Sequence, residues 1–325
     1  MIQKVEISAK TIVFTIFFLL SLWVVWLLRE LIFALLFAFI FMSALKPAVA
    51  SLVKRGIPRF LSSLLVFITT ITLLVILFQF ILPPIIQEAL AFIKNLPGLI
   101  AHSFPYLASS VDIDSFLQFL PNVTQNALRL VTGLFSNIIF LISVFFFTFY
   151  FLLEEQFMAS LIERFVDTKK TKSLLILIDR IERRMHAWVW GEIVLMLIIG
   201  FATYIGLSFL GIRYALSLAV IAGLLEVVPI IGPIISAVPA FFVAASMSPV
   251  LGSVIIVLYI IIQQFENNLI VPIVMKRAVG LHPVMTLIAL TVGGKLGGLM
   301  GVILSVPIAL IIESVLIEYS NTKEG

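Results

Sequence analysis

The sequence predicts an all-α, polytopic integral membrane protein with about eight transmembrane helices, some of them broken by proline and glycine. Of its 325 residues, 62% are hydrophobic and only 12% are charged, and the mean hydropathy is +1.22. A soluble chain is closer to half apolar and a quarter charged, so most of this chain must face lipid. The apolar runs are continuous and do not alternate at a period of two, which favours helices over the strands of a membrane barrel.

Uninterrupted apolar runs indicate the individual spans, because a spanning helix needs roughly 20 apolar residues. The clear runs are 11–28, 31–46, 60–82, 134–153, 191–210 and 249–266. The first lacks a small-residue cleavage site, so it is expected to stay in the protein as a helix. Since only Arg29 and Glu30 separate the first two runs, a tight hairpin is expected there. Two further apolar regions, 214–248 and 283–318, are interrupted by proline and glycine.

The segments between these runs divide the chain into five parts. The parts are helices 1 to 3 (1–83), an extracytoplasmic amphipathic segment (84–133), helix 4 (134–153), a cytoplasmic amphipathic helical segment (154–190) and a C-terminal transport core (191–325). The fourth part carries an apolar stripe at helical spacing: Leu161, Phe165, Leu174, Leu177, Ile181 and Met185. Two interpretations stay open for this stripe, an interfacial helix and a surface that binds a partner or a second copy of the chain.

The basic residues predict the orientation, because cytoplasmic loops of membrane proteins are enriched in lysine and arginine. With a cytoplasmic N-terminus and alternating spans, sixteen of the 21 basic residues lie inside and four outside. Those outside are Arg29, Lys94, Arg129 and Arg213, and Lys295 falls at membrane depth. A multi-pass protein of a bacterial inner membrane with both termini in the cytoplasm is therefore expected. The net charge of +4 records this topology, and no nucleic-acid partner is expected.

Several kinds of chemistry have no counterpart in the sequence. The absence of cysteine excludes disulfides, thiolate nucleophiles and Cys-ligated metals. Nothing resembles a catalytic triad or a metal-ligand cluster, so no catalytic residue, metal or cofactor is expected and the chain is not predicted to be an enzyme. The glycines around Lys295 lack the strand, helix and Ser/Thr of a phosphate-binding loop, which argues against an ATP-driven pump.

The two broken regions resemble each other. At an offset of 69 residues, Gly232, Ile234 and Ser236 match Gly301, Ile303 and Ser305, and Val238-Pro239 then matches Val306-Pro307 after one skipped residue. A proline inside a helix removes a backbone hydrogen bond, and in lipid such breaks persist only where protein or water satisfies the freed groups. With the predicted topology, the two regions enter the membrane from opposite faces. They are interpreted either as re-entrant hairpins of an inverted repeat, as in several secondary transporters, or as pairs of short kinked spans.

Three motifs in this part of the chain resemble those of the AI-2E family, the autoinducer-2 exporter-like or PerM-type permeases. They are Glu226-Val227-Val228-Pro229-Ile230-Ile231-Gly232-Pro233 with Pro239-Ala240; Gln263 to Pro272 with Gly280-Leu281-His282-Pro283; and Val306-Pro307-Ile308-Ala309. The motifs cover about 213–310, and the order of segments before them also fits. The resemblance implies a membrane transporter, since members are linked to export of the autoinducer-2 signal and others to sodium/proton antiport. A lysine at position 295 is not expected to be obligatory in this family.

Polar residues at membrane depth are the candidate functional residues. A carboxylate at the bilayer centre costs several kcal/mol and usually faces a cavity or a partner. Glu226 lies three residues before Pro229 and matches Lys295 in the repeat, so it is interpreted either as a proton-carrying group or as the ion-pair partner of Lys295. Polar residues at the end of the 249–266 run suit a cation or a polar solute, or form an amide-rich interfacial helix end. The candidates for substrate, ion or proton binding are Glu226, Pro229, Gly232, Pro233, Gln263, Gln264, Glu266, Asn267 and Lys295.

The leading functional hypothesis is a secondary transporter that exports a small polar solute, autoinducer-2-like, with a proton or sodium gradient. A Na⁺(Li⁺)/H⁺ antiporter is the alternative in the same class. A membrane scaffold that transports nothing and recruits partners through 154–190 is the alternative of another class. The expected partners are thus the solute, H⁺ or Na⁺ and the lipid bilayer, with a homo-oligomer left open.

Overall fold

The computed structural model describes residues 9–76, 79, 83, 138–154, 160, 168–275 and 281–324. Within these ranges every regular element is helical, as the sequence predicts. The predicted extracytoplasmic segment 84–133 lies outside the described residues, as does most of 154–167. Six described helices are long and apolar enough to cross a membrane: Lys10–Leu27, Arg29–Lys54, Arg59–Ile76, Ser173–Phe209, Pro249–Val274 and Val284–Glu318. The chain is therefore an all-α, multi-pass membrane protein.

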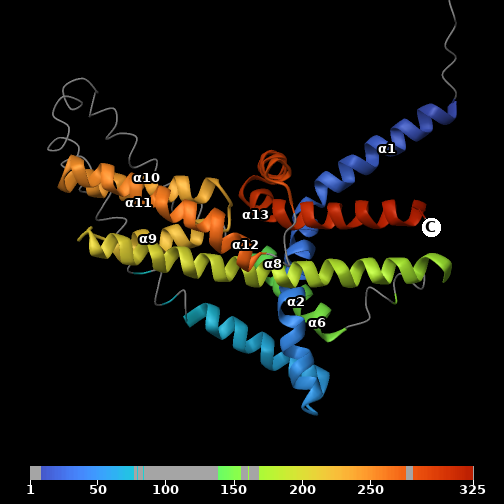
Figure 1. Ribbon diagram of the computed structural model, residues 1–325. Helices are drawn as coiled ribbons and strands as arrows, with labels where there is room; N and C mark the ends of the chain where they lie inside the picture. Colours follow the sequence, from blue (N-terminus) through green and yellow to red (C-terminus); the bar gives the residue numbers. More distant parts are fainter. Residues whose placement is uncertain are drawn as a thin grey trace, which may run out of the picture.

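The first two helices are joined end to end. Helix α1 (Ala9–Leu27) projects away from the other helices, and α2 (Arg29–Lys54) continues from it at an angle (Figure 1). The amide of Leu28 donates to Val24 O at 2.9 Å and the amide of Ile32 to Leu28 O at 3.0 Å, which is the helical i to i−4 pattern. The hairpin predicted at Arg29-Glu30 is therefore wrong, because neither residue breaks the backbone hydrogen bonds that a reversal would have to interrupt.

Helix α2 then packs against α6 (Ile138–Leu153) and the helix Arg59–Ile76. Phenylalanine pairs join Arg59–Ile76 to α6, with ring centroids 5.4 Å apart for Phe67 and Phe149. The Arg59 Nε donates to the carbonyl oxygens of Leu152 and Leu153, at 3.2 and 3.0 Å. Since the last carbonyls of a helix have no partners within it, Arg59 caps the end of α6 and fixes the two helices relative to each other.

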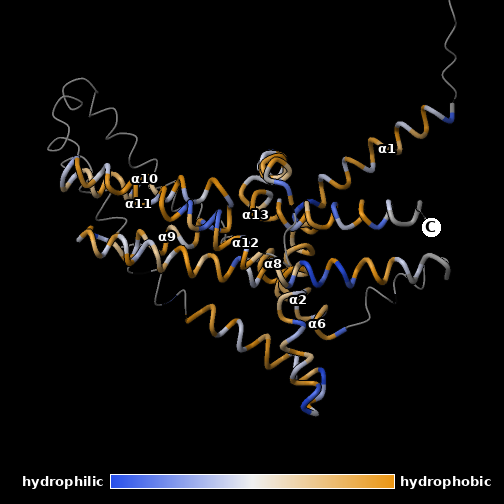
Figure 2. The backbone as a smooth tube through the Cα atoms, viewed as in Figure 1, coloured by the Kyte–Doolittle hydropathy of each residue, from blue (hydrophilic) through white to orange (hydrophobic). Residues whose placement is uncertain are grey.

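Helix α8 (Thr168–Phe209) spans 42 residues without a break, so it is about 63 Å long. It crosses position 190, the boundary predicted between a cytoplasmic segment and a span. Hydrophilic residues recur along the N-terminal half of α8, whereas its C-terminal half is mostly apolar (Figure 2). In the first half, the stripe residues Leu177, Ile181 and Met185 are buried together with Leu304 and Leu310 of α13. These stripe residues form part of the core of this chain.

Ion pairs attach the same half of α8 to two other helices. Arg180 pairs with Glu318 at 3.1 Å, and Arg184 pairs with Glu313 and donates to Ser314 at 2.9 Å. Lys46 of α2 pairs with Glu182 at 2.5 Å. All three pairs are less than 36% exposed, so water screens them only in part. The hydrophilic half of α8 is therefore held between α2 and the end of α13.

The apolar half of α8 packs against α9 (Ala215–Leu225) and α11 (Pro249–Phe265), and α10 (Ile231–Met247) packs against α9 and α11 (Figure 1). Leu207, Leu218, Ala240 and Ile255 form their common core. After α11 follow a π-helical segment η1 (Glu266–Ile270), the short α12 (Val271–Val274) and α13 (Pro283–Glu324). The core is continuous from α8 to α11, and it surrounds the first broken region.

Both broken regions form hairpins of two helices. The first reverses between α9 and α10, where Ile230 has φ 71°. The second reverses inside α13 at Gly298, which has φ 57° and ψ −138°. Residues 293 and 301 would be about 12 Å apart in a straight helix, yet a Cβ atom at Gly293 would collide with the carbonyl oxygen of Gly301. The backbone has thus turned back on itself within both broken regions.

Candidate functional site

Glu226 lies directly after the last residue of α9, at the start of the first hairpin turn. The amide of Val228 donates to Leu225 O at 3.0 Å, and that of Ile231 to Pro229 O at 2.8 Å, so the turn closes on its own backbone. Ile230 adopts a positive φ that a β-branched residue rarely takes, a strain worth about 1–3 kcal/mol. The turn directs the Glu226 side chain inward, where only 2% of its surface is exposed.

Gly232 allows the two limbs of this turn to meet. A Cβ atom at this position would overlap the carbonyl oxygen of Leu225, so any larger residue would push α10 away from α9. Pro229 and Pro233 lie on either side of Gly232, and both are half-buried. Proline at these positions removes amide donors that the turn would leave unpaired in an apolar environment. The predicted residues Pro229, Gly232 and Pro233 therefore shape the backbone that holds Glu226.

Glu266 lies where α11 changes to the π-helical segment η1. Such single π-turns are rare and occur often at functional sites. The Glu266 side chain is buried, and Gln263 Nε2 donates to its Oε2 at 2.9 Å. Gln263 and Glu266 thus lie together on one face of the helix.

A third buried carboxylate, Glu192, comes from α8. It is 5% exposed and lies within the candidate span Ser173–Phe209. The prediction from sequence did not include it. The sequence did offer a signal for it: Glu192 is a glutamate within an apolar run, next to Gly191 and four residues before Met196. The same membrane-insertion cost that singled out Glu226 applies to Glu192.

The three carboxyl groups form one cluster, the Glu192–Glu226–Glu266 cluster. Glu226, Glu266 and Glu192 lie close enough together for their charges to interact. The Oε2 atom of Glu226 is fully buried and has no donor among the described residues. Burial and the repulsion between neighbouring negative charges both favour the neutral form of a carboxyl group. The cluster is therefore suited to hold at least one proton.

No basic side chain among the described residues neutralises the negative charge of this cluster. In the described ranges, none of the three glutamates forms an ion pair with a lysine, arginine or histidine. Each ionised carboxylate at the bilayer centre costs about 3 kcal/mol on insertion scales, and three neighbouring negative charges add mutual repulsion. Within the same ranges no group of three His, Cys, Asp or Glu side chains is spaced to hold a metal ion. Protons are the species that this arrangement accommodates most simply.

The remaining predicted site residues lie apart from the cluster. Lys295 is exposed on α13 near the Gly298 turn, and no ion pair joins it to Glu226, both of which are described residues. Gln264 and Asn267 are exposed, and Gln264 Oε1 accepts from Asn268 Nδ2 at 3.0 Å. The ion-pair interpretation of Glu226 therefore has no support in this arrangement.

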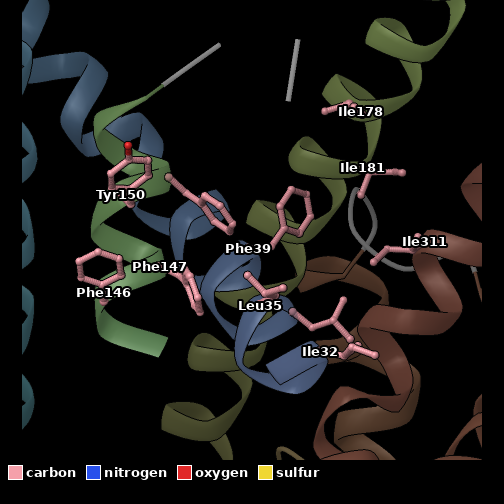
Figure 3. A pocket seen from close by; sticks show the side chains of 11 residues that line it. Ile32, Leu35, Phe39, Phe146, Phe147, Tyr150, Ile178, Ile181 and Ile311 are labelled. Atoms are coloured by element: carbon pink, nitrogen blue, oxygen red, sulfur yellow. The ribbon is translucent and has the colours of Figure 1, made fainter. Parts of the chain in front are cut away.

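A cleft of about 410 Å³ lies between α10 and α11. Gln263, the residue that donates to Glu266, is one of its lining residues, but none of the three glutamates lines it. A larger pocket of about 640 Å³ lies between α2, α6, α8 and α13 (Figure 3). In Figure 3, Phe39 and Phe147 face it from α2 and α6, and Ile181 and Ile311 face it from α8 and α13. The linings of both pockets are almost wholly apolar, and Tyr259 and Gln263 are the polar side chains that line the cleft between α10 and α11.

Comparison with known proteins identifies relatives of this chain. The family model of the AI-2E family transporters matches residues 12–321. The chain is similar to the putative transport protein YueF of Bacillus subtilis, with 29% identity over 310 residues, covering 88% of this chain and 84% of YueF. It is also similar to the putative transport protein YrrI of B. subtilis (26% identity, 96% and 93% covered) and to the putative permease PerM of Escherichia coli (23% identity, 80% and 79% covered).

Proposed function

This chain belongs to the AI-2E family of transporters, and from that premise we propose that it is a secondary transporter. It would export a small solute with polar groups, autoinducer-2-like, in exchange for protons that enter through the Glu192–Glu226–Glu266 cluster. The observation that carries the proposal is the burial of three adjacent carboxyl groups without a cationic partner among the described residues. A structural role alone would not require three groups whose insertion into the membrane is so costly.

The position of the cluster supports this role. Each glutamate comes from a different part of the transport core: α8, the turn after α9, and the start of η1. A rearrangement of the hairpin turn or of the π-helical segment would change the distance between Glu226 and Glu266, and with it the number of protons that the pair holds. Backbone breaks in discontinuous helices form the substrate and ion sites of several secondary transporters.

We place the protein in a bacterial inner membrane with the end of α2, the first half of α8 and the C-terminus in the cytoplasm. The distribution of basic residues supports this orientation. The ion pairs also agree with it. They join Lys46 of α2 to α8, and Arg180 and Arg184 of α8 to the end of α13. The charge distribution assigns these three segments to the same side of the membrane.

The test uses purified protein in liposomes that contain a pH-sensitive dye. A gradient of autoinducer-2, Na⁺ or Li⁺ is imposed and proton movement is followed. We expect one of these gradients to drive protons across the membrane, with Glu226→Gln and Glu266→Gln each lowering the rate at least about tenfold, in the range typical for loss of a proton-transferring group. The control is Glu154→Gln, an exposed glutamate at the end of α6. Unchanged coupling in both cluster variants would remove the proposed role of the cluster.

A Na⁺(Li⁺)/H⁺ antiporter is the second candidate. The carboxyl cluster favours it only as the proton carrier, because the three carboxyl groups are not spaced to hold a metal ion themselves. The same liposomes distinguish the two candidates: proton movement driven by Na⁺ or Li⁺ alone indicates the antiporter, and movement that requires the solute indicates the exporter. A scaffold without transport activity would move no protons under any of the gradients.

A further inference from the structure

We propose that the hydroxyl groups of Thr203, Ser217 and Tyr259 line a chain of bound waters that conducts protons between the outer surface and the carboxyl cluster. The inference rests on the proposed function, since it supplies the route by which protons reach the cluster. It is carried by the burial of the three hydroxyls, by their lack of hydrogen-bond partners among the described residues, and by their position on three helices that pack together.

The three hydroxyl groups are buried and unpaired. Thr203 of α8 is 1% exposed, Ser217 of α9 is 3% exposed and Tyr259 of α11 is 9% exposed. None of their oxygen atoms has a hydrogen-bond partner in the described ranges, and the same is true of the Oε2 atom of Glu226. Leaving a buried polar group unbonded costs about 1–3 kcal/mol. Ordered water is the usual partner of such groups inside proteins, because it bonds to several of them at once.

Other hydroxyls that are equally buried bond to the backbone of their own helix. Thr148 of α6 and Ser314 of α13 each donate to the carbonyl oxygen four residues earlier, at 2.7 Å in both cases. This bond is common for serine and threonine inside helices. The hydroxyls of Thr203 and Ser217 do not make it. They are therefore directed away from their own backbone and can both donate to and accept from water.

Thr203 and Ser217 lie at the contact between α8 and α9. A Cβ atom at Gly200 of α8 would be 3.4 Å from the carbonyl oxygen of Ala219 in α9. Thr203 follows Gly200 by one turn on the same face of α8, and Ser217 precedes Ala219 by two residues. Ser217 is also only four residues after the exposed Arg213, which the charge distribution assigns to the outer side. The hydroxyls at this contact therefore lie near the outer end of the transport core.

Tyr259 lies beside the same part of α8. A Cβ atom at Gly206, one turn after Thr203, would be 2.8 Å from the side chain of Leu258, the residue before Tyr259. Tyr259 also belongs to the same core cluster as Leu218 of α9. The three hydroxyls thus come from three different helices that meet in one region.

A polar face of α11 connects this region to the cluster. Tyr259, Gln263 and Glu266 are spaced by four and three residues, so they share one side of the helix. Gln263 Nε2 already donates to Glu266 Oε2 at 2.9 Å. The seven residues from Tyr259 to Glu266 rise about 10 Å along the helix. About three hydrogen-bonded waters span that distance, since an O–H···O bond is about 2.8 Å long.

Such a row conducts protons without any net change in its own composition. Each water or hydroxyl oxygen forms a bond to an incoming proton through a lone pair and breaks its bond to a proton that it already carries. One proton that enters at the outer end therefore releases one to a carboxylate of the cluster, and every oxygen in between is left neutral. Chains of polar side chains serve as proton relays in membrane pumps and transporters for the same reason.

The first measurement detects water beside Thr203. Because the chain has no cysteine, Thr203→Cys carries a single thiol, whose S–H stretching band is followed by infrared spectroscopy of the purified full-length protein. The matched control is Thr148→Cys, at an equally buried position where the native hydroxyl bonds to its own helix. After transfer to D₂O, we expect the thiol of Thr203→Cys to exchange at least about tenfold faster than the control, because exchange at a dry buried site waits for local unfolding. Thermal unfolding checks that both variants are folded.

The second measurement is proton movement in the liposome assay. Tyr259→Phe removes only the hydroxyl, and we expect it to slow proton movement about fivefold or more, as loss of a proton-transferring group does. Thr148→Val should leave the rate unchanged. A rate equal to that of the unmodified protein in Tyr259→Phe, or thiol exchange in Thr203→Cys as slow as in Thr148→Cys, would overturn the proposal. Failure of the proposed function is distinguishable from both, since the unmodified protein would then move no protons, whereas thiol exchange is measured without flux.

Discussion

Gly232 and Gly301, matched by the internal repeat, occupy the same structural position in two different hairpins. A Cβ atom at either residue would overlap a carbonyl oxygen of the opposite limb, that of Leu225 in one hairpin and of Gly293 in the other. Four residues later, Ser236 donates to Pro233 O at 3.0 Å and Ser305 donates to Val302 O at 2.6 Å, each bridging to position i−3. The two regions thus share local backbone structure as well as sequence.

The close approach of the hairpin limbs can be tested with two neighbouring glycines. Gly293 faces the backbone of Gly301, whereas a Cβ at Gly294 meets only a methyl group of Val302, at 3.2 Å. We expect Gly293→Ala to destabilise the protein by about 1–3 kcal/mol, the usual cost of forcing a methyl group into a packed site. Gly294→Ala should cost less, because the side chain of Val302 can move by a few tenths of an ångström. Thermal unfolding in detergent measures both, and equal effects would contradict the hairpin packing.

Glu192 provides a test of the cluster that the sequence motifs alone did not suggest. We expect Glu192→Gln to slow proton coupling in liposomes about tenfold while the protein remains folded, because the change keeps the shape of the side chain and removes its ability to carry a proton. A double variant with Glu226→Gln should show less than the sum of the two effects, since groups that act as a unit are not additive. Independent, additive effects would show that Glu192 does not act together with Glu226.

The ion pair between Arg184 and Glu313 is expected to stabilise the contact between α8 and α13. Removing one partner by Arg184→Gln should lower the free energy of unfolding by about 1–3 kcal/mol, since both side chains are largely buried and Ser314 would also lose its donor. Arg183→Gln is the control: its pair with Asp179 is 70% and 59% exposed. Water screens that pair, so its loss should cost less than about 1 kcal/mol. Similar losses for both variants would show that burial of the Arg184 pair adds nothing.

The orientation can be tested by labelling single cysteines, since the chain has none of its own. Ser51 at the end of α2 and Ser208 at the end of α8 are both exposed. With a membrane-impermeant thiol reagent added to intact cells, Ser208→Cys should react and Ser51→Cys should react only after the cells are opened. The reverse pattern would contradict the proposed orientation and the assignment of the two hairpins to opposite faces.

The sequence by itself determined the membrane environment, the helical class and the positions of the breaks. These properties depend on local composition: apolar runs long enough to span, and proline and glycine that cannot continue a helix in lipid. Glu226, Gln263 and Glu266 could be identified in the same way, because a polar residue in an apolar run is costly wherever the rest of the chain lies.

Only the tertiary structure decided which of these residues meet. The repeat placed Glu226 opposite Lys295, but α8 and η1 bring Glu192 and Glu266 to it, and Lys295 stays exposed. The junction at Leu28 likewise continues as helix, where the charged Arg29-Glu30 pair had suggested a reversal. The physical reason is the same in both cases. Side-chain partners and chain reversals depend on how separate helices pack, and close packing is set by contacts between residues that are distant in the sequence.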